Sequence, residues 1–387
     1  MGFIPDIEFK ERISKLQAIM AKEGYDIMMA YGNEAEPQFV RYLSDYWPSF
    51  ETAGVLVPVE GEPLLLIGPE SYTYAADRSR IPEIRLLKAF RESSEPEYPG
   101  KKLSTFNEVF DEVLKGRKFT KFGVAGLPLV TIGVYDALKE ALGDIPIVKA
   151  DDLVSQLRMI KTENELACMR EAAEITRKSF DYVLENIRPG MTETQVVGLA
   201  LSKMHELGAE RESYPHWVLT GEGSNQAISR PRQKVIQPGD MTMIQIGARV
   251  AGYASSIGRP VVFGKATAEQ KAIIEAGYTG QNAVLGFIKA GLCAGDVARH
   301  YEKALADIGF GDHLLYGPCH GNGMMEGEAP WIENNSTWIL KENMTFCLDV
   351  FLGNNKNKTG LRMEDVIRIT KDGAENLTHY PQKLFEL

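Results

Sequence analysis

The side chains with the clearest catalytic potential lie in the last third of the chain. His320 lies in the stretch Cys-His-Gly-Asn-Gly, where glycines let the backbone approach a ligand closely. Asp349 and Glu364 stand at alternating positions of two strand-like segments, Phe346–Val350 and Arg362–Ile367. An imidazole beside two carboxylates can move protons and activate water, because neighbouring charges shift the pKa values of all three groups. His320, Asp349 and Glu364 are therefore the candidate catalytic residues, provided that the fold brings them together.

Each of these side chains also has an ordinary structural explanation. A single histidine is most often a packed residue, and carboxylates on a strand are often solvated or ion-paired. Arg362 lies close enough along the strand to pair with Asp349 or Glu364. We keep Arg362 as a candidate substrate-binding residue, because a guanidinium beside a site can also hold an anionic group.

Five segments around these residues resemble the site of the creatinase, prolidase and aminopeptidase P family, the pita-bread hydrolases of peptidase family M24. In that family the segments supply two Asp, one His and two Glu, which hold two divalent ions about 3.5–4 Å apart. The resemblance runs through nearly the whole chain and implies an α/β (α+β) fold. It implies a creatinase-like N-terminal domain and a pita-bread domain with a curved, mainly antiparallel sheet and pseudo-two-fold symmetry. The segments are Gln237–Ala248, Gly252–Arg259, Gly317–Gly323, Glu342–Val350 and Gly360–Asp365.

The resemblance places the five metal ligands on Gln245, Ser256, His320, Asp349 and Glu364. Two of the family's four carboxylates are therefore replaced by an amide and a hydroxyl. Two dications need several anionic oxygens to offset their mutual repulsion, and hard ions prefer carboxylates. We expect no dinuclear centre and no required cofactor, with at most one weakly bound divalent ion. Gln245 and Ser256 are then expected to orient a substrate amide or amidine, or only to fill space.

Further parts of the family's peptidase site are also altered. Two histidines that contact the substrate in the family fall on Ile228 and Gly327, whose side chains donate no hydrogen bond. Glu328 matches an acidic position of the family and is a candidate substrate-binding residue. For both Glu328 and Glu326, the alternative interpretation is an ordinary solvated position on the surface. His216, in Tyr-Pro-His-Trp, is a candidate substrate-binding residue, although a packed strand residue is the simpler interpretation.

An aromatic segment near the N-terminus, Tyr42–Val55, is a second candidate region. In creatinase, a Phe and an Arg from the partner subunit close over the substrate. Phe50 matches that Phe, whereas the Arg position is Thr52. Trp47 and Phe50 would form a lid over a cationic or planar ligand in a homodimer, or they would simply be core residues.

Composition limits the class of protein without deciding its function. The chain has 387 residues and a formal net charge of -10, which argues against a nucleic-acid partner. Its four cysteines form no C-x-x-C pair, which suits free thiols in a reducing compartment. No apolar stretch approaches the length of a membrane span, and the N-terminus has no signal-peptide pattern. We expect a cytoplasmic protein with a small-molecule substrate and no membrane partner.

Alternating helix and strand patterns divide the chain into two expected domains, 1–154 and 155–387. The N-terminal pattern predicts a helix over 7–23, another helix within 101–121, and strands over 27–30, 54–59, 63–67, 122–124 and 147–148. Thr162 is the expected N-cap of a long helix that runs to about residue 187. Later helices are expected near 192–207, 267–289 and 295–308, with strands at 213–220, 241–248, 259–263, 345–352 and 362–370.

Three functions fit these observations. The first is metal-independent hydrolysis of a C–N bond in a small molecule, such as a cyclic amide, amidine or guanidino compound, as in creatinase or the ectoine hydrolases. The second is an Xaa-Pro dipeptidase or aminopeptidase that keeps one divalent ion on His320, Asp349 and Glu364. The third is a non-catalytic paralogue that binds a small molecule. The first is preferred, because the family's ligand set is incomplete.

Overall fold

The computed structural model describes residues 2–356 and 358–387, which form two compact units. One unit is Ile4–Arg158, and the other is Met159–Leu387 together with Gly2 and Phe3. Helix α6, Asp151–Arg158, ends the first unit. The expected boundary between residues 154 and 155 falls inside this helix, and the units divide directly after it.

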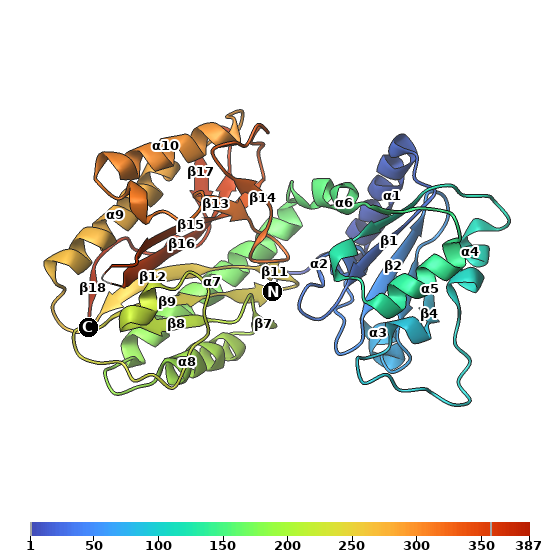
Figure 1. The fold of residues 1–387 in the computed structure, drawn as a ribbon, viewed down its shortest axis with the longest axis horizontal. Helices are drawn as coiled ribbons and strands as arrows, with labels where there is room; N and C mark the ends of the chain where they lie inside the picture. The colour runs from blue at the N-terminus through green and yellow to red at the C-terminus, as the bar shows by residue number, and fades with distance from the viewer. Residues whose placement is uncertain (1, 357) are drawn as a thin grey trace. The chain divides into compact units, whose positions relative to one another are not determined.

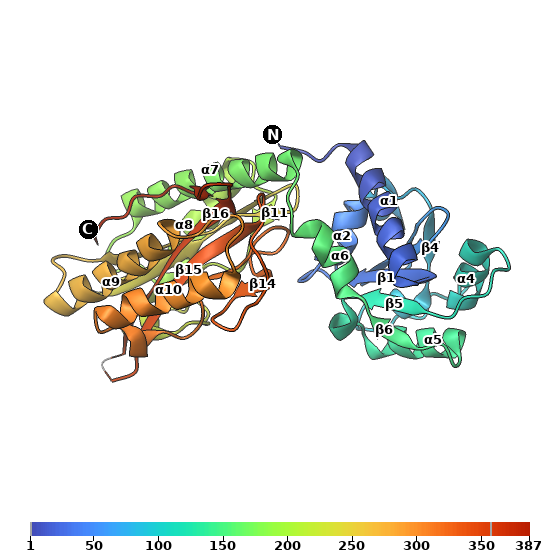
Figure 2. The same ribbon diagram turned by 90° about the horizontal axis from the view of Figure 1, so that it is seen from above.

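A six-stranded sheet with the order β4-β3-β2-β1-β5-β6 forms the centre of the first unit. β1 runs antiparallel to β2 and parallel to β5, so the sheet is mixed. Helices α4 and α5 cover one face through a shared apolar core, and Figure 2 shows α1 on the other side of the strands. The elements are α1 (Asp6–Glu23), β1 (Ile27–Gly32), α2 (Gln38–Ser44), β2 (Ala53–Pro58), β3 (Leu64–Ile67), α3 (Tyr72–Arg78), β4 (Ile84–Leu86), α4 (Phe106–Leu114), β5 (Phe122–Ala125), α5 (Ile132–Leu142) and β6 (Ile147–Lys149).

The second unit is built on a larger sheet with the order β14-β13-β15-β16-β12-β9-β8. All neighbours on this path are antiparallel, as expected for this domain. β7, β10 and β11 form a separate small sheet, and β17 and β18 pair with the large sheet at β16 and β12. The strands of the unit are β7 (Arg211–Glu212), β8 (Trp217–Thr220), β9 (Met241–Ile246), β10 (Ala248–Val250), β11 (Tyr253–Ala254), β12 (Ile257–Val262), β13 (Cys319–Gly321), β14 (Glu328–Ile332), β15 (Thr345–Asn354), β16 (Thr359–Ile369), β17 (Ala374–Asn376) and β18 (Phe385–Glu386).

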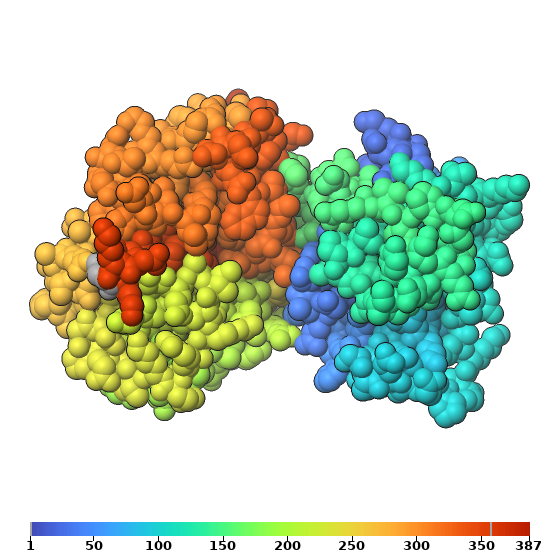
Figure 3. Space-filling model, in the orientation of Figure 1, coloured from blue at the N-terminus to red at the C-terminus, as the bar shows by residue number. Residues whose placement is uncertain are grey.

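Four helices cover this sheet in two pairs, α7 (Glu163–Asn186) with α8 (Glu193–Glu206) and α9 (Ala268–Leu285) with α10 (Ala294–Asp307). The first pair shares an apolar core with β8, β9 and β12, and the second with β15 and β16. Figure 1 shows α9 and α10 side by side over β15 and β16. In the space-filling view most of this surface is orange and yellow, and the red strands emerge in one small area (Figure 3).

Strand alternation decides which side chains meet these helices. Leu348 and Val350 of β15 belong to the core under α9 and α10. Because successive strand residues point to opposite faces, Cys347 and Asp349 point away from those helices. The sheet therefore separates an apolar, helix-covered face from a face that carries polar side chains.

Threonine caps define where the main helices begin. The hydroxyl of Thr162 accepts a hydrogen bond from the backbone N–H of Glu165, whose carboxylate accepts one from the Thr162 N–H. This capping box confirms the predicted N-cap. Thr192 and Thr267 begin α8 and α9 in the same way.

Two expected elements are located more narrowly by the structure. The helix expected within 101–121 is α4, because a capping box at Thr105 begins it and Lys115 ends it in a left-handed conformation. The strand expected over 213–220 begins only at Trp217, after Pro215, which has no N–H for a strand ladder. In the described part of the chain, no helix is long and apolar enough to cross a membrane.

Candidate active site

Strand register brings four potentially reactive side chains together on the polar face of the large sheet. His320 of β13 pairs across from Cys347 of β15, and Asp349 of β15 pairs across from Glu364 of β16. Cys347 and Asp349 are two residues apart, so they share one face. All four residues are at most 4% exposed. Side chains from three strands thus meet in one buried group.

Two acidic side chains surround the His320 ring. Its Nε2 lies 3.7 Å from Oε1 of Glu326 and 3.9 Å from Oδ2 of Asp349. Its Nδ1 lies 3.1 Å from the carbonyl oxygen of Gly321, which fits Nδ1–H as the donor. This backbone contact favours the tautomer whose Nε2 lone pair faces the carboxylates.

A guanidinium compensates one of the carboxylates. Nε of Arg362 lies 3.5 Å from Oδ1 of Asp349, and the hydroxyl of Tyr316 donates a hydrogen bond to Oδ2 at 2.7 Å. Arg362 also donates to the carbonyl of Ala227 at 2.8 Å and lies over the ring of Trp217. Burial lowers the pKa of Arg362, but the charge of Asp349 and other nearby acids outweighs it, so the net shift is upward. Arg362 is therefore a permanent cation inside the site.

Glu364 is the most strongly perturbed acid of the group. Burial, followed by the charges of Glu326 and Asp349, raises its pKa well above the usual range. Its Oε2 accepts a hydrogen bond from Nε2 of Gln245, while its Oε1 has no hydrogen-bond partner among the described residues. One oxygen of Glu326 and one of Asp349 are likewise buried without a partner in the described part of the chain. Three buried acids with unpartnered oxygens thus lie near a single guanidinium.

The structure brings Gln245 and Ser256 to this same group. Both are fully buried, and Gln245 contacts Glu364 directly. The hydroxyl of Ser256 lies 2.8 Å from the hydroxyl of Tyr214. Burial, followed by the charges of Glu364 and Glu326, raises the pKa of Tyr214, so this phenol keeps its proton and can donate a hydrogen bond.

Four side chains of the site form a group that could hold a divalent ion. Ligand atoms of His320, Glu326, Cys347 and Glu364 all lie within 4.8 Å of one another. An imidazole nitrogen, two carboxylates and a thiol are suitable ligands for one transition-metal ion. The side chains at 245 and 256 are neutral; the Gln245 amide N–H donates to Glu364, and its Oε1 is buried without a hydrogen-bond partner among the described residues. A second ion would add positive charge beside Arg362, which already faces Asp349.

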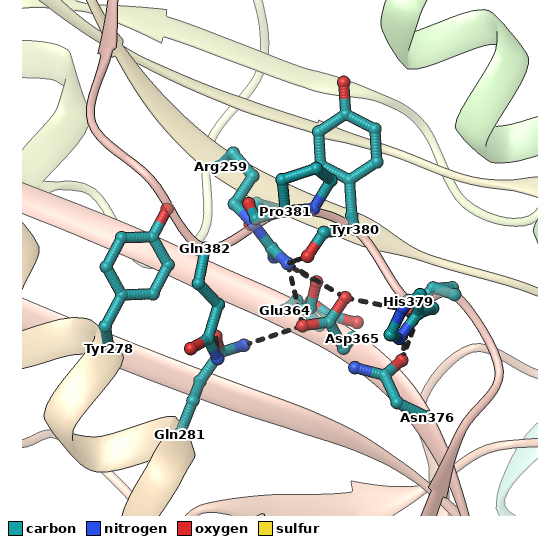
Figure 4. Close-up of polar contacts among 12 residues, drawn as sticks. Arg259, Tyr278, Gln281, Glu364, Asp365, Asn376, His379, Tyr380, Pro381 and Gln382 are labelled. Carbon is teal, nitrogen blue, oxygen red and sulfur yellow. Dashed lines mark hydrogen bonds and ion pairs between the residues drawn. The ribbon is translucent and has the colours of Figure 1, made fainter.

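The other face of the sheet carries a fully paired charge directly behind Glu364. Arg259 of β12 donates to both carboxylate oxygens of Asp365, at 3.0 and 2.8 Å, and to the Glu364 carbonyl at 2.9 Å. Gln281 and Thr378 donate to the same carboxylate. Figure 4 shows Asp365 held between Arg259 and Gln281, with Glu364 next to it on β16. This network fixes the backbone from which Glu364 projects.

Two other predicted site residues have partners that explain them structurally. Glu328 of β14 pairs with the buried ammonium of Lys161 at 3.3 Å. His216 precedes β8 and is buried, and its Nε2 lies 3.1 Å from the Gly247 carbonyl oxygen. Burial lowers the pKa of His216 to about 4, so the ring is neutral at physiological pH. His216 is thus a packed residue, but in a loop rather than the expected strand.

The predicted lid residues belong to the first unit. Trp47 donates its indole N–H to the carbonyl of Glu34 at 2.9 Å, and the guanidinium of Arg41 stacks over its ring. Phe50 is 84% exposed and has a φ of 58°. Trp47 is thus anchored locally, whereas the Phe50 side chain is not part of the core.

Four residues of the site were not among the predicted site residues: Tyr214, Tyr316, Glu326 and Cys347. Cys347 could have been found from alternation, since it stands two residues before Asp349 on one strand. Glu326 lies in the loop before β14, where no periodicity tells which acid points inward. Nothing in the local sequence of Tyr214 or Tyr316 indicated that their hydroxyls meet Ser256 and Asp349.

Comparison with known proteins places both units in described families. Residues 167–371 match the model of metallopeptidase family M24, and residues 12–160 match the creatinase/prolidase N-terminal domain. An Xaa-Pro dipeptidase of Pyrococcus furiosus is 27% identical over 376 residues, which cover 97% of this chain and 99% of that protein. An Xaa-Pro dipeptidase of Lactobacillus delbrueckii subsp. lactis is 25% identical, over 96% of this chain and 98% of the relative.

Solved structures show the same fold. The Xaa-Pro dipeptidase from Bacillus anthracis superposes with a TM-score of 0.82 at 24% identity, over 98% of this chain and 100% of that one. The X-Pro aminopeptidase from Thermotoga maritima MSB8 gives a TM-score of 0.84 at 24% identity, over 97% and 99%. These matches confirm the expected combination of a creatinase-like domain and an antiparallel catalytic domain.

Proposed function

This chain belongs to metallopeptidase family M24, and from that premise we propose that it is a hydrolase of C–N bonds that uses one divalent ion. The observation that carries the proposal is the set of buried carboxylate oxygens without hydrogen-bond partners on Glu326, Asp349 and Glu364. Unpaired buried charge is costly, and a cation among these oxygens would remove most of that cost.

Short peptides are the substrate class that the relatives favour. The named relatives are Xaa-Pro dipeptidases, and a peptide bond is a C–N bond that a single ion can help to hydrolyse. Ile228 is 83% exposed and Gly327 lies beside the His320 ring, so neither supplies the imidazole that the family resemblance expects there. The contacts to the substrate must therefore differ from those of a typical family member.

In this proposal, His320, Glu326 and Glu364 hold the ion, and Asp349 moves the proton. When bound, a divalent ion supplies Lewis-acid chemistry that polarises a carbonyl and acidifies water. Oδ1 of Asp349 is free to accept a proton from the attacking water, while Tyr316 fixes Oδ2. The same Oδ1 can return the proton to the leaving nitrogen. Arg362 stabilises the negative charge beside it.

Metal-free hydrolysis remains a second candidate, because Arg362 already supplies a cation and Gln245 already occupies part of the acidic group. His320 would then be the base, since its Nε2 faces Glu326 and Asp349. A strained ring or an amidine is the better substrate for this reaction than a dipeptide, because water attack on an ordinary amide without an ion is slow.

Metal content and hydrolysis, measured on the same samples, separate these candidates. Protein purified without added metal is assayed by elemental analysis before and after incubation with Mn²⁺, Co²⁺ or Zn²⁺. Xaa-Pro dipeptides, cyclic amides, ureido acids and guanidino compounds are then screened by mass spectrometry with and without EDTA. We expect one ion per chain and hydrolysis that EDTA abolishes. Two tightly held ions per chain would refute the proposal, and hydrolysis that survives EDTA would favour the metal-free candidate.

His320→Ala tests the centre of the site in either case. Loss of the His320 imidazole should lower turnover about 10²–10⁴-fold while the fold stays intact. His300→Ala is the matched control, because His300 of α10 stacks on Phe287, which follows α9, outside the site. Equal activity of His320→Ala and wild type would show that the catalytic residue is misassigned. Binding of a ligand with no product from either protein would identify a non-catalytic paralogue.

We also propose a homodimer in which the Trp47–Phe50 segment of each chain covers the partner's site. The support is the exposed aromatic ring of Phe50 beside a locally anchored Trp47, together with the matching Phe in the family resemblance. An exposed aromatic in a left-handed backbone conformation is unfavourable in a free loop, so a contact that uses it is a reasonable explanation.

A further inference from the structure

The thiol of Cys347 lies where an ion ligand would be needed. Cys347 is fully buried and stands across from His320 in the β13–β15 ladder. Its Sγ belongs to the group of four ligand atoms within 4.8 Å, with His320, Glu326 and Glu364. Two members of this group, Glu326 and Glu364, each have a buried carboxylate oxygen that no hydrogen bond satisfies. The thiol therefore shares its surroundings with unpaired acceptors that point to a missing cation.

We propose that Cys347 and Glu326 complete a single-ion site with His320 and Glu364, so that a thiolate takes over from the carboxylates that positions 245 and 256 lack. The inference rests on the proposed single-ion hydrolase and names the ligands and the preferred metal. It differs from the expected set of His320, Asp349 and Glu364, since the ion lies toward Cys347 and not toward Asp349.

The geometry needs only a small contraction. For Zn²⁺, bonds of about 2.0–2.3 Å in a tetrahedron place ligand atoms about 3.3–3.8 Å apart. The longest separation in the group is below 4.8 Å, so rotation of the Glu326 and Glu364 side chains by about 1 Å at their ends closes it. His320 is already prepared, because its Nδ1 faces the Gly321 carbonyl and leaves Nε2 to bind.

Asp349 is a poorer ligand because its charge is already compensated. Its Oδ2 accepts a hydrogen bond from Tyr316, and its Oδ1 faces Arg362. Among the described residues no Lys or Arg forms an ion pair with Glu326 or Glu364, although the charge of Arg362 also acts on Glu364. Arg362 thus offsets the charge of Asp349, whereas Glu326 and Glu364 would gain most from an added ion.

Binding also exchanges a proton for the metal. The S–H bond of Cys347 breaks, a sulfur–metal bond forms, and the proton leaves to solvent. Burial, followed by the charge of Glu364, raises the pKa of the free thiol, so without an ion the sulfur stays protonated. A thiolate ligand favours Zn²⁺ and Co²⁺ over Mn²⁺ and Mg²⁺, which prefer oxygen.

Cobalt spectroscopy on the full-length, chelator-treated protein tests this assignment. Co²⁺ is titrated under reducing conditions, and the near-ultraviolet band of thiolate-to-cobalt charge transfer is recorded with the bound-metal ratio. We expect one Co²⁺ per chain with this band. The band should disappear in Cys347→Ser, and Zn²⁺ affinity should fall at least about 10-fold. Cys319→Ala is the matched control, since Cys319 is buried next to His320 but belongs to the apolar core; it should keep the band.

Each other result decides against the thiolate. The inference is overturned if wild type binds an ion without the charge-transfer band, or if Cys347→Ser keeps the spectrum and the affinity unchanged. The proposed single-ion hydrolase still stands in both cases if EDTA abolishes hydrolysis. No bound ion in wild type overturns it as well, and hydrolysis in EDTA then decides the proposed function separately. If Cys347→Ser does not fold, X-ray absorption of the wild-type Zn²⁺ protein replaces it; absence of a sulfur neighbour at about 2.3 Å overturns the inference.

Discussion

Glu364 and Asp365 are consecutive acids on β16, and they illustrate two different uses of a buried charge. Asp365, on the helix-covered face, is held by Arg259, Gln281 and Thr378. Glu364, on the polar face, accepts one hydrogen bond from Gln245 and keeps one oxygen without a partner. The strand is the same and both side chains are fully buried, so the difference lies entirely in what each face supplies.

The contrast shows where the sheet is stabilised and where it is prepared for a ligand. A buried ion pair that is fully hydrogen-bonded tolerates no loss of one partner. An unpaired buried acid destabilises the ligand-free protein and binds strongly whatever cation arrives. Arg259 connects the two faces, because it bonds both the Asp365 carboxylate and the Glu364 carbonyl. Stability on one side thus keeps the reactive group on the other side in place.

The largest change in the free energy of unfolding is expected for Asp365→Asn. The amide leaves Arg259 buried without its counter-charge, which should lower the free energy of unfolding by about 3–5 kcal/mol. Urea unfolding followed by circular dichroism measures this loss. Glu222→Gln is the matched control, because Glu222 forms an exposed pair with Lys358 and should cost less than about 1 kcal/mol. A loss below about 1 kcal/mol for Asp365→Asn would show that the two faces do not differ as described.

Replacement of the preceding acid, Glu364, by its amide should instead raise the free energy of unfolding. In protein stripped of divalent ions, Glu364→Gln removes a buried carboxyl group whose charged form has no counter-ion, and should stabilise the fold by about 1–3 kcal/mol near neutral pH. Addition of Zn²⁺ should stabilise wild type and not this variant. Destabilisation of the ion-free protein by Glu364→Gln would contradict the comparison.

The pH dependence of stability sharpens this second test. The folded pKa of Glu364 lies above its unfolded value, so the folded state binds the proton more tightly. Its favourable contribution is complete below the ordinary carboxyl range and is lost as pH rises through the raised folded pKa. Ion-free wild type should therefore lose stability with rising pH in that window, and Glu364→Gln should lose less.

The smallest effect is expected for Phe50→Ala in the first unit. Phe50 is 84% exposed, whereas Phe90 in the same unit is fully buried. Removal of the Phe50 ring should change stability by less than about 0.5 kcal/mol and weaken ligand binding by about 0.5–1 kcal/mol in a dimer. Phe90→Ala, the contrasting variant, should cost about 3–5 kcal/mol of stability. Light scattering at micromolar concentration that gives the single-chain mass of 43.0 kDa would contradict the proposed lid.

Periodicity in the sequence predicted most of the elements that position the site. Strand alternation placed Asp349 and Glu364 correctly on β15 and β16, and the Thr162 cap marked the start of α7. These features depend on neighbours within a few residues, which the sequence shows directly. A helix was expected within 101–121, and the cap at Thr105 and a left-handed Lys115 confine it to Phe106–Leu114.

The sequence alone determined the family, the two-part fold and the loss of carboxylates at Gln245 and Ser256, since those follow from segment order and residue type. Only the tertiary structure decided which charges meet. Glu326 points to His320 while Glu328, two residues later, pairs with Lys161. Cys347 joins the site because β13 lies beside β15. The physical reason is that the partner of a buried charge comes from long-range packing, and a loop has no period from which that packing can be read.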